Sequence, residues 1–111
     1  MHHQINPDMK ACIEDCLRCH SVCLGMASHH CLAQGGKHVE PTHFRVMLAC
    51  SEICRSAAEM MLIGSGHHSR ICAACAEVCD ACAASCEALG DMEDCVESCR
   101  RCAVSCRRMA G

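Results

Sequence analysis

Cysteine is the residue type in this chain that could do chemistry, and it recurs at a regular spacing. Sixteen of the 111 residues are cysteines. Between Cys72 and Cys86, five of them are separated by alternating steps of three and four residues. Residues spaced in this way share one face of an α-helix. This stretch therefore predicts a helix whose inner stripe consists of thiols.

Thiols four residues apart are suited to binding a soft metal ion. Their Cβ atoms lie about 5–6 Å apart on a helix, and a metal bridging two thiolates linearly holds the sulfurs roughly 4–5 Å apart. Two-coordinate thiolate ligation suits Cu(I). The candidate metal ligands are all sixteen cysteines: Cys12, Cys16, Cys19, Cys23, Cys31, Cys50, Cys54, Cys72, Cys75, Cys79, Cys82, Cys86, Cys95, Cys99, Cys102 and Cys106.

Charge balance predicts how many ions such an array would hold. Sixteen buried thiolates cannot remain uncompensated, so without metal they are neutral thiols, and they release protons when metal binds. If each thiolate bridges two ions and each ion takes two thiolates, ions and thiolates are equal in number. This predicts about 16 Cu(I) per chain, about one per cysteine.

The elements that position these thiols are indicated by caps and by glycines. Asn6 and Pro7 form a helix start, Gly35-Gly36 a helix end, and Asp91 an expected cap for the last helix. The predicted helices span about 7–34, 41–64, 67–89 and 92–109. Short connections favour antiparallel neighbours, so we expect an all-α, up-down-up-down antiparallel four-helix bundle forming a single domain over residues 1–111.

Composition narrows the classes of partner and compartment. A net charge of −3 and an aromatic content of 1% argue against a nucleic-acid partner. No apolar run approaches membrane-spanning length, and the first residues do not form a secretory signal. We therefore expect a cytoplasmic, non-enzymatic protein with no membrane partner, in a compartment where cysteines serve as metal ligands more often than in disulfides.

The bundle topology also assigns histidines and methionines to its two ends. We expect His30, His43 and Met47 to act as auxiliary ligands or to admit the metal, because they extend the thiol stripes at one end. Copper should then first occupy sites near Cys23, Cys31, Cys50 and Cys86. The remaining histidines considered are expected to be solvated: His2, His3, His29, His38 and His67. The opposite end should be sealed by bulky apolar groups: Met60, Met61, Leu62, Ile63, Ile5 and Ile71.

Other functions remain open from the residues alone. A zinc-binding structural or interaction module is the main alternative, although zinc requires tetrahedral sets of four ligands and residues 41–64 carry only Cys50 and Cys54. A thiol redox protein is a third class, but no βαβ pattern surrounds Cys72 and Cys75. Two further interpretations are that the thiols only pack in the core, and that they form an interhelical disulfide framework. No cysteine run typical of iron–sulfur proteins is present.

The repeated Cys-x3-Cys and Cys-x2-Cys steps resemble those of the bacterial copper storage proteins, specifically the cytosolic members. The resemblance extends from about Pro7 to Met109 and is carried by the segments 12–23, 72–86 and 95–106. It implies a four-helix bundle that stores many Cu(I) ions along a cysteine-lined core, assembly as a homotetramer, and metal uptake past His and Met residues at one open end. Copper ions and a copper chaperone are the expected partners. The departures are the two cysteines of residues 41–64 and the methionines that flank the stripes.

Overall fold

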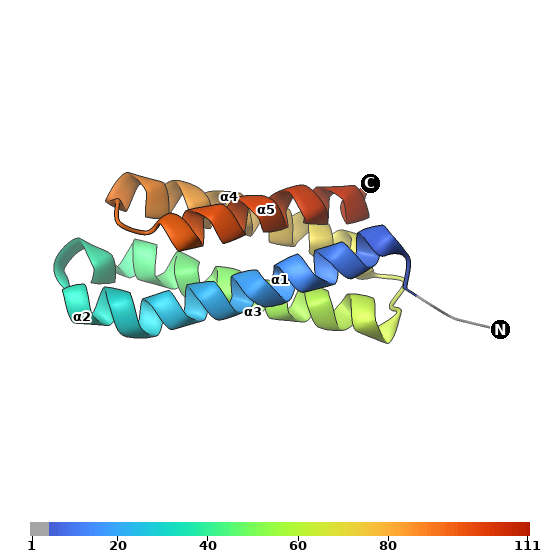
Figure 1. Ribbon diagram of the computed structural model, residues 1–111, viewed down its shortest axis with the longest axis horizontal. Coiled ribbons are helices and arrows are strands. Elements are labelled where there is room, and N and C mark those ends of the chain that lie inside the picture. Colours follow the sequence, from blue (N-terminus) through green and yellow to red (C-terminus); the bar gives the residue numbers. More distant parts are fainter. Residues whose placement is uncertain (1–4) are drawn as a thin grey trace.

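Four long helical segments run lengthwise through the computed structural model of the protein, which describes residues 5–111 (Figure 1). The first segment begins as an α-helix and continues through a π-helical turn into a short α-helix. The elements in chain order are α1 (Pro7–Gly25), the π-helix η1 (Met26–Cys31), α2 (Leu32–Gln34), the 3₁₀-helix η2 (Gly36–Val39), α3 (Pro41–Ile63), α4 (His68–Leu89) and α5 (Glu93–Ala110). Residues 5–111 contain no strand.

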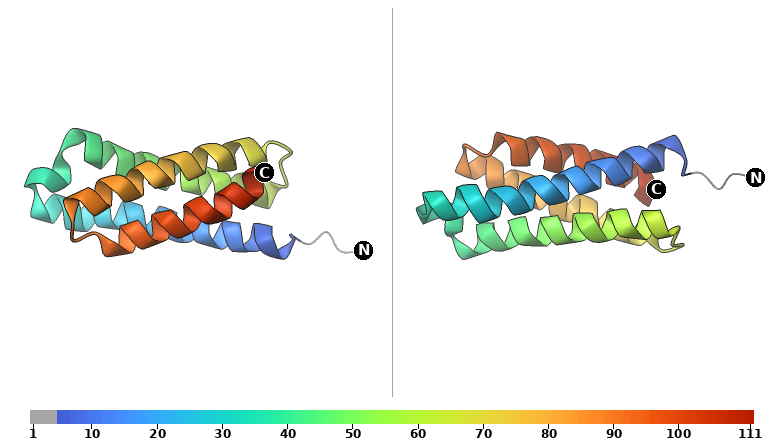
Figure 2. Two further views of the ribbon diagram at one scale, coloured as in Figure 1. Left: turned by 90° about the horizontal axis from the view of Figure 1, so that it is seen from above. Right: turned by 60° about the horizontal axis from the view of Figure 1, so that its bottom comes forward.

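The helices pack as a ring of four neighbours around one long core. Helix α1 contacts α3 and α5, and α4 also contacts α3 and α5, so each helix has two principal partners (Figure 2). The molecule measures 54 × 22 × 18 Å. The prediction of an all-α, antiparallel four-helix bundle is confirmed. No helix within residues 5–111 has the length and apolar character needed to cross a membrane.

Two helices begin at a side chain that caps the first turn, and one predicted cap is absent. The side chain of Asn6 accepts a hydrogen bond from the Met9 amide at 2.8 Å, and that of Glu40 accepts one from the His43 amide at 3.0 Å. The prediction that Asp91 caps the last helix is wrong. Asp91 has a φ of 61° and belongs to the turn, while α5 begins at Glu93 after Met92.

The π-helical turn η1 changes which residues face the core. A π-helix closes its hydrogen bonds over five residues, whereas an α-helix closes them over four. Residues that face the core are therefore spaced by four residues or more in a π-helical turn. Cys23, Ala27 and Cys31, each four residues after the last, are all fully buried. His30 was expected to continue the thiol stripe, but the π-turn leaves it partly exposed and brings Cys31 inward instead.

The apolar end of the bundle is closed differently from the prediction. Met61 is 1% exposed and its sulfur lies 3.9 Å from that of Cys72. Leu62 and Ile63, however, are 55% and 75% exposed. They lie on the last turn of α3, directly before Gly64 reverses the chain with a φ of 78°. The expectation that Leu62 and Ile63 seal the core is therefore wrong.

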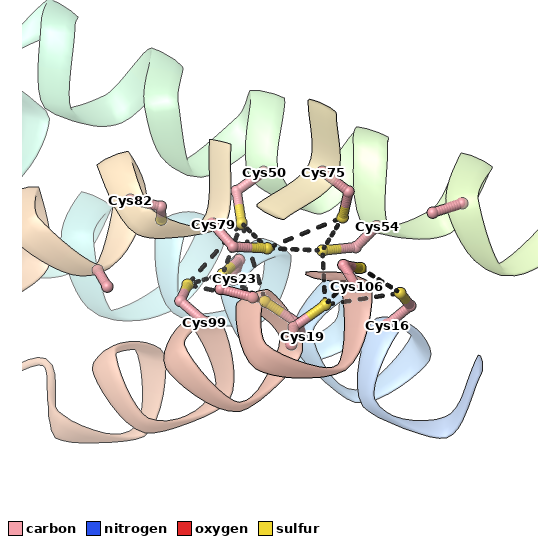
Figure 3. Close-up of a cluster of buried hydrophobic side chains, with 14 of the residues drawn as sticks. Cys16, Cys19, Cys23, Cys50, Cys54, Cys75, Cys79, Cys82, Cys99 and Cys106 are labelled. Carbon is pink, nitrogen blue, oxygen red and sulfur yellow. Dashed lines mark hydrogen bonds between the residues drawn. The ribbon is translucent and has the colours of Figure 1, made fainter. Parts of the chain in front are cut away.

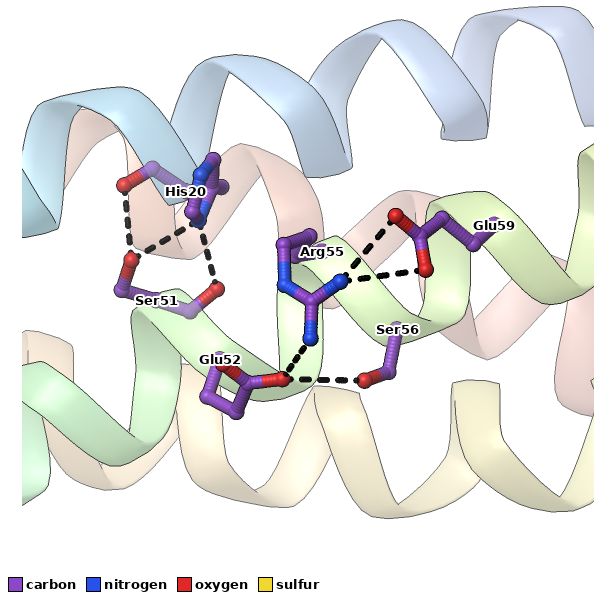
Figure 4. A network of polar contacts seen from close by, with 6 residues as sticks. All are labelled: His20, Ser51, Glu52, Arg55, Ser56 and Glu59. Atoms are coloured by element: carbon purple, nitrogen blue, oxygen red, sulfur yellow. Dashed lines mark hydrogen bonds and ion pairs between the residues drawn. The ribbon is translucent and has the colours of Figure 1, made fainter.

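Polar contacts lie on the outer surface of the bundle, between helices and along α3. The Ser51 hydroxyl donates to the carbonyl of His20 at 2.9 Å, which links α3 to α1 (Figure 4). Along α3, Arg55 pairs with Glu59 at 3.1 Å and also with Glu52. These ion pairs are exposed to solvent, and exposed pairs contribute little to stability. The buried face of the helices is therefore the main source of stability.

Candidate metal centre

The core of the bundle consists of thiols. All sixteen cysteines have a relative exposure of 0%, and none is in a disulfide. Four of them come from α1, one from the adjoining η1, two from α3, five from α4 and four from α5. Alanine fills the narrow positions beside them, including Ala57, Ala76 and Ala103. Small side chains on every helix allow the sulfurs to meet on the bundle axis.

Sulfur atoms within and between helices are in direct contact (Figure 3). Cys19 and Cys23, one turn apart on α1, have sulfurs 3.8 Å apart. Contacts across the core are as short, with 3.5 Å between Cys23 and Cys99. A linear thiolate bridge requires about 4.6 Å, twice a metal–sulfur bond of about 2.3 Å. Side-chain rotations that part the sulfurs by about 1 Å would therefore admit a two-coordinate ion.

Helix α3 has few cysteines, but both are central. The sulfur of Cys54 lies 3.7 Å from that of Cys75, 3.6 Å from that of Cys79 and 3.8 Å from that of Cys102. Cys50 lies 3.7 Å from Cys79 as well. The low cysteine content of residues 41–64 therefore does not leave a gap, because each thiol of α3 contacts more than one neighbouring helix.

The thiols form groups that overlap rather than separate sites. Within residues 5–111, sets of three or four sulfurs lie within 4.8 Å of one another. Cys19, Cys50 and Cys54 each belong to two of these sets. A tetrahedral zinc site needs four ligands of its own, whereas a thiolate shared between sets is placed to bridge two ions. The sets are Cys16/Cys75/Cys102/Cys106, Cys19/Cys50/Cys54/Cys79, Cys19/Cys23/Cys50/Cys99, Cys54/Cys75/Cys79/Cys102 and Cys12/Cys72/Cys106.

Thioether sulfurs lie at both ends of the array. The sulfur of Met26 lies 3.4 Å from that of Cys95, at the end of the bundle formed by η1 and the α4–α5 turn. At the other end Met61 contacts Cys72. Thioethers are soft donors that favour Cu(I). Both ends therefore offer weaker sulfur ligands beside the thiols.

Two of the three predicted auxiliary residues lie together against Cys31. Met47 is fully buried, with its sulfur 3.7 Å from that of Cys31. His43 is 5% exposed, and its Nε2 lies 4.0 Å from the same sulfur. Its Nδ1 lies 2.7 Å from the hydroxyl oxygen of Ser85. Burial lowers the pKa of His43, which favours the neutral imidazole that binds metals.

The third predicted residue, His30, stands further out. Its Nε2 lies 3.6 Å from a carboxylate oxygen of Asp91 and has no hydrogen-bond partner within residues 5–111. Its ring meets that of His38 edge-on, with ring centroids 5.1 Å apart. No contact joins His30 to a thiol in the described part of the chain. It therefore lies at the rim rather than in line with the thiol stripe.

His38 is a candidate ligand that the sequence analysis placed wrongly on the solvated surface. It is half-buried, and its Nδ1 lies 3.9 Å from the sulfur of Cys31. The turn at Gly35 and Gly36, both with positive φ, folds η2 back over the end of the first helical segment. The paired glycines were the available signal, because they allow a histidine seven residues after Cys31 to return to it.

Known proteins resemble the chain over almost its full length. The copper storage protein family is matched by residues 5–111. The Nmul_A1745 protein from Nitrosospira multiformis is 52% identical, with a TM-score of 0.92 over 93% of this chain and 94% of that one. Cu(I)-bound copper storage protein BsCsp3 is 32% identical (TM-score 0.87, covering 94% and 99%), and apo-Csp3 from Bacillus subtilis is 33% identical (TM-score 0.76, covering 92% and 98%).

A comparison with curated proteins gave no match. The family match and the solved structures confirm the resemblance drawn from the cysteine spacing. The chain belongs to the copper storage protein family.

Proposed function

We propose that this chain stores Cu(I) along the bundle axis, with all sixteen cysteines as ligands and about one ion per cysteine. The observation that carries the proposal is the network of buried thiols in contact, which runs without a gap from Cys12 and Cys106 to Cys23 and Cys99. Neighbouring sulfurs lie 3.5 Å apart at Cys23 and Cys99 and at Cys16 and Cys102. Membership of the copper storage protein family supports the choice of metal.

Charge supports the stoichiometry. A buried thiolate is costly unless a cation compensates it, so each ion that enters should release one proton from the array. The pKa of Cys31 is raised by burial, which illustrates the preference for the neutral thiol when no metal is bound. One Cu(I) for each thiolate leaves the core neutral. The filled bundle is then no more charged than the empty one.

The same arrangement supports storage rather than catalysis. A catalytic metal site keeps a coordination position open for substrate, and the thiols of this core are inaccessible to solvent at 0% exposure. An ion held between two buried thiolates has no place for a second molecule. We therefore propose a non-enzymatic role.

Metal uptake is proposed at the end that carries His30, His43 and Met47. Met47 and His43 contact Cys31, and His30 lies outside them beside Asp91. Donors at a rim can accept copper and pass it inward by ligand exchange, from imidazole to thioether to thiolate. A copper chaperone is the proposed donor, and the cytoplasm the proposed compartment, because free thiols persist in reducing surroundings.

The proposed homotetramer is supported by apolar side chains on the outside of the bundle. Leu17 and Leu24 are each 42% exposed. They lie seven residues apart on α1 and so share one face of that helix. Exposed apolar side chains on the outer face of a bundle helix are suited to pairing with another copy.

Anaerobic titration of the reduced protein tests the function. Cu(I) is added in the presence of a chromophoric Cu(I) chelator, and the number of ions withheld from the chelator is counted. We expect about 16 Cu(I) per chain. Saturation at about four Zn(II), with no excess of Cu(I) retained, would favour the zinc-binding structural module instead. Ready disulfide formation with no metal retained would favour a thiol redox protein.

A further inference from the structure

Four thiols of the core form a closed tetrahedron of sulfur atoms. They are Cys19 and Cys23 of α1, Cys50 of α3 and Cys99 of α5, and all four are fully buried (Figure 3). All six pairs of sulfurs are in contact. The distances are 3.8 Å for Cys19–Cys23, 3.8 Å for Cys19–Cys50, 3.7 Å for Cys19–Cys99, 4.0 Å for Cys23–Cys50, 3.5 Å for Cys23–Cys99 and 3.8 Å for Cys50–Cys99.

These distances are those of a tetrahedral site with four thiolate ligands. A zinc–sulfur bond of about 2.3 Å at the tetrahedral angle separates two sulfurs by about 3.8 Å. Atoms that only pack together also lie roughly 3.5–4.0 Å apart, so a single contact indicates packing alone. Six such contacts among four atoms, however, require a tetrahedron, and its centre lies about 2.3 Å from each sulfur. An ion with that bond length fits the set as it stands.

The geometry of this set suits a tetrahedral divalent ion without rearrangement. Linear coordination of Cu(I) requires two sulfurs to part to about 4.6 Å, whereas tetrahedral coordination leaves the sulfurs where they are. Four sulfur ligands in a tetrahedron are typical of zinc. Three helices hold the ligands before a metal arrives, so little ordering is required on binding.

A neighbouring set of four thiols is less completely closed. It consists of Cys54, Cys75, Cys79 and Cys102, and it shares no thiol with the first set. Contacts of 3.6–3.8 Å join four of its six sulfur pairs. The set that includes Cys19 is therefore the better candidate for a tetrahedral ion.

Charge limits the core to one such ion. Zn(II) replaces four thiol protons, one from each ligand, so the filled site carries two negative charges. Cys50 of the first set lies 3.7 Å from Cys79 of the neighbouring set. Two filled sites would therefore place two buried dianions side by side, which burial makes costly.

We propose that Cys19, Cys23, Cys50 and Cys99 form a tetrathiolate site that binds one Zn(II) in the copper-free protein and releases it when Cu(I) enters. The zinc ion would join α1, α3 and α5 while copper is absent. Four Cu(I), one per thiolate, then take the place of one Zn(II), and the charge of the four-thiolate set changes from minus two to zero. Zinc binding is independent of the proposed storage function, and only the release of zinc rests on it.

Anaerobic titration of the reduced, metal-free protein with Zn(II) tests the site. A chromophoric zinc chelator competes for the metal, and the ions withheld from it are counted. We expect one Zn(II) per chain. Co(II) is the probe of geometry, because a tetrahedral set of thiolates gives it intense visible d–d bands. One Co(II) per chain should produce these bands, and Zn(II) should remove them.

Cys99→Ala should lose both the retained zinc and the cobalt bands. Cys102→Ala is the matched control, because Cys102 lies one turn further along the same helix, is equally buried and belongs only to other sets. The control should keep one ion and its bands. If Cys99→Ala does not fold, Cys23→Ala repeats the comparison on α1, with Cys16→Ala as its control.

Release is measured by adding Cu(I) to the zinc-loaded protein and determining zinc in the filtrate by elemental analysis. All the zinc should be released by the time about 16 Cu(I) per chain are bound. The proposal is overturned if the wild-type protein withholds no Zn(II) or more than one, if Cys99→Ala keeps the ion, if Cys102→Ala loses it, or if zinc stays in the copper-filled chain. A protein that stores copper but withholds no zinc would refute this site and leave storage intact.

Discussion

Helix α3 contributes only two cysteines to the thiol array, Cys50 and Cys54, and this makes Cys54→Ala an informative change. The Cys54 sulfur contacts Cys75 and Cys79 of α4 and Cys102 of α5. Cys12→Ala is the matched control, since Cys12 is also fully buried but is one of four cysteines of α1. If copper crosslinks the helices, the first variant should loosen α3 and the second should not.

Without copper the two variants should behave alike. Each loses one buried sulfur, comparable to one methylene group, with a small cavity in its place, at a cost of about 1 kcal/mol. For a domain of this size the thermal midpoint should fall by roughly 4–8 °C in both. Amide exchange through global opening should accelerate by about fivefold, the factor that corresponds to about 1 kcal/mol.

With copper bound the two variants should differ in the protection of the α3 amides. Hydrogen exchange of the α3 amides, followed by mass spectrometry on the loaded proteins, should accelerate in Cys54→Ala by clearly more than in its apo form. In Cys12→Ala the α3 amides should stay as protected as in the loaded wild type. Equal α3 protection in the two loaded variants would refute the view that the metal ties α3 to its neighbours through these contacts.

Three further outcomes follow from the structure. The metal-free protein should be helical by circular dichroism, because protonated cysteines pack as small hydrophobic groups; a coil-like spectrum would contradict this. Burial lowers the pKa of His43, so the unfolded chain takes up the proton first and the apo protein should lose stability as the pH falls below about 6.5; urea titrations at several pH values should show a weaker loss in His43→Asn. Replacing His30 and His43 together by Ala should slow Cu(I) loading in stopped-flow experiments with the capacity nearly unchanged, whereas unaltered loading would argue for uptake elsewhere.

The helices and the thiol stripes could be predicted because both depend on short-range spacing. Steps of three and four residues place cysteines on one helical face whatever that face packs against. Asn6, Pro7 and Gly35 indicated helix ends through local backbone preferences, and these were observed. The face of each stripe and its burial therefore followed from the sequence.

The positions of His30, Cys31 and His38 could not be predicted to the same extent. They depend on the backbone hydrogen bonding of η1 and on how the chain folds back after Gly36. A single π-helical turn exchanges His30 for Cys31 on the inner face, and nothing in the residue types of 26–31 specifies that hydrogen-bond pattern. The position of His38 depends on how η2 folds back after Gly36, which is a long-range contact. The exposure of Ile63 likewise reflects its place on the last turn of α3, directly before Gly64 reverses the chain.

The almost exclusive use of cysteine and alanine in the core has a consequence for how the protein fills. A cysteine side chain has one rotatable bond with three staggered positions, so each thiol can reorient independently of the backbone. Parting two sulfurs from 3.5 Å to about 4.6 Å then disturbs only the immediate neighbours. Binding of one ion leaves distant thiols such as Cys12 and Cys86 unaltered. Partly filled chains should therefore be stable species, and the protein should take up and release copper gradually, as a buffer, over a wide range of copper supply.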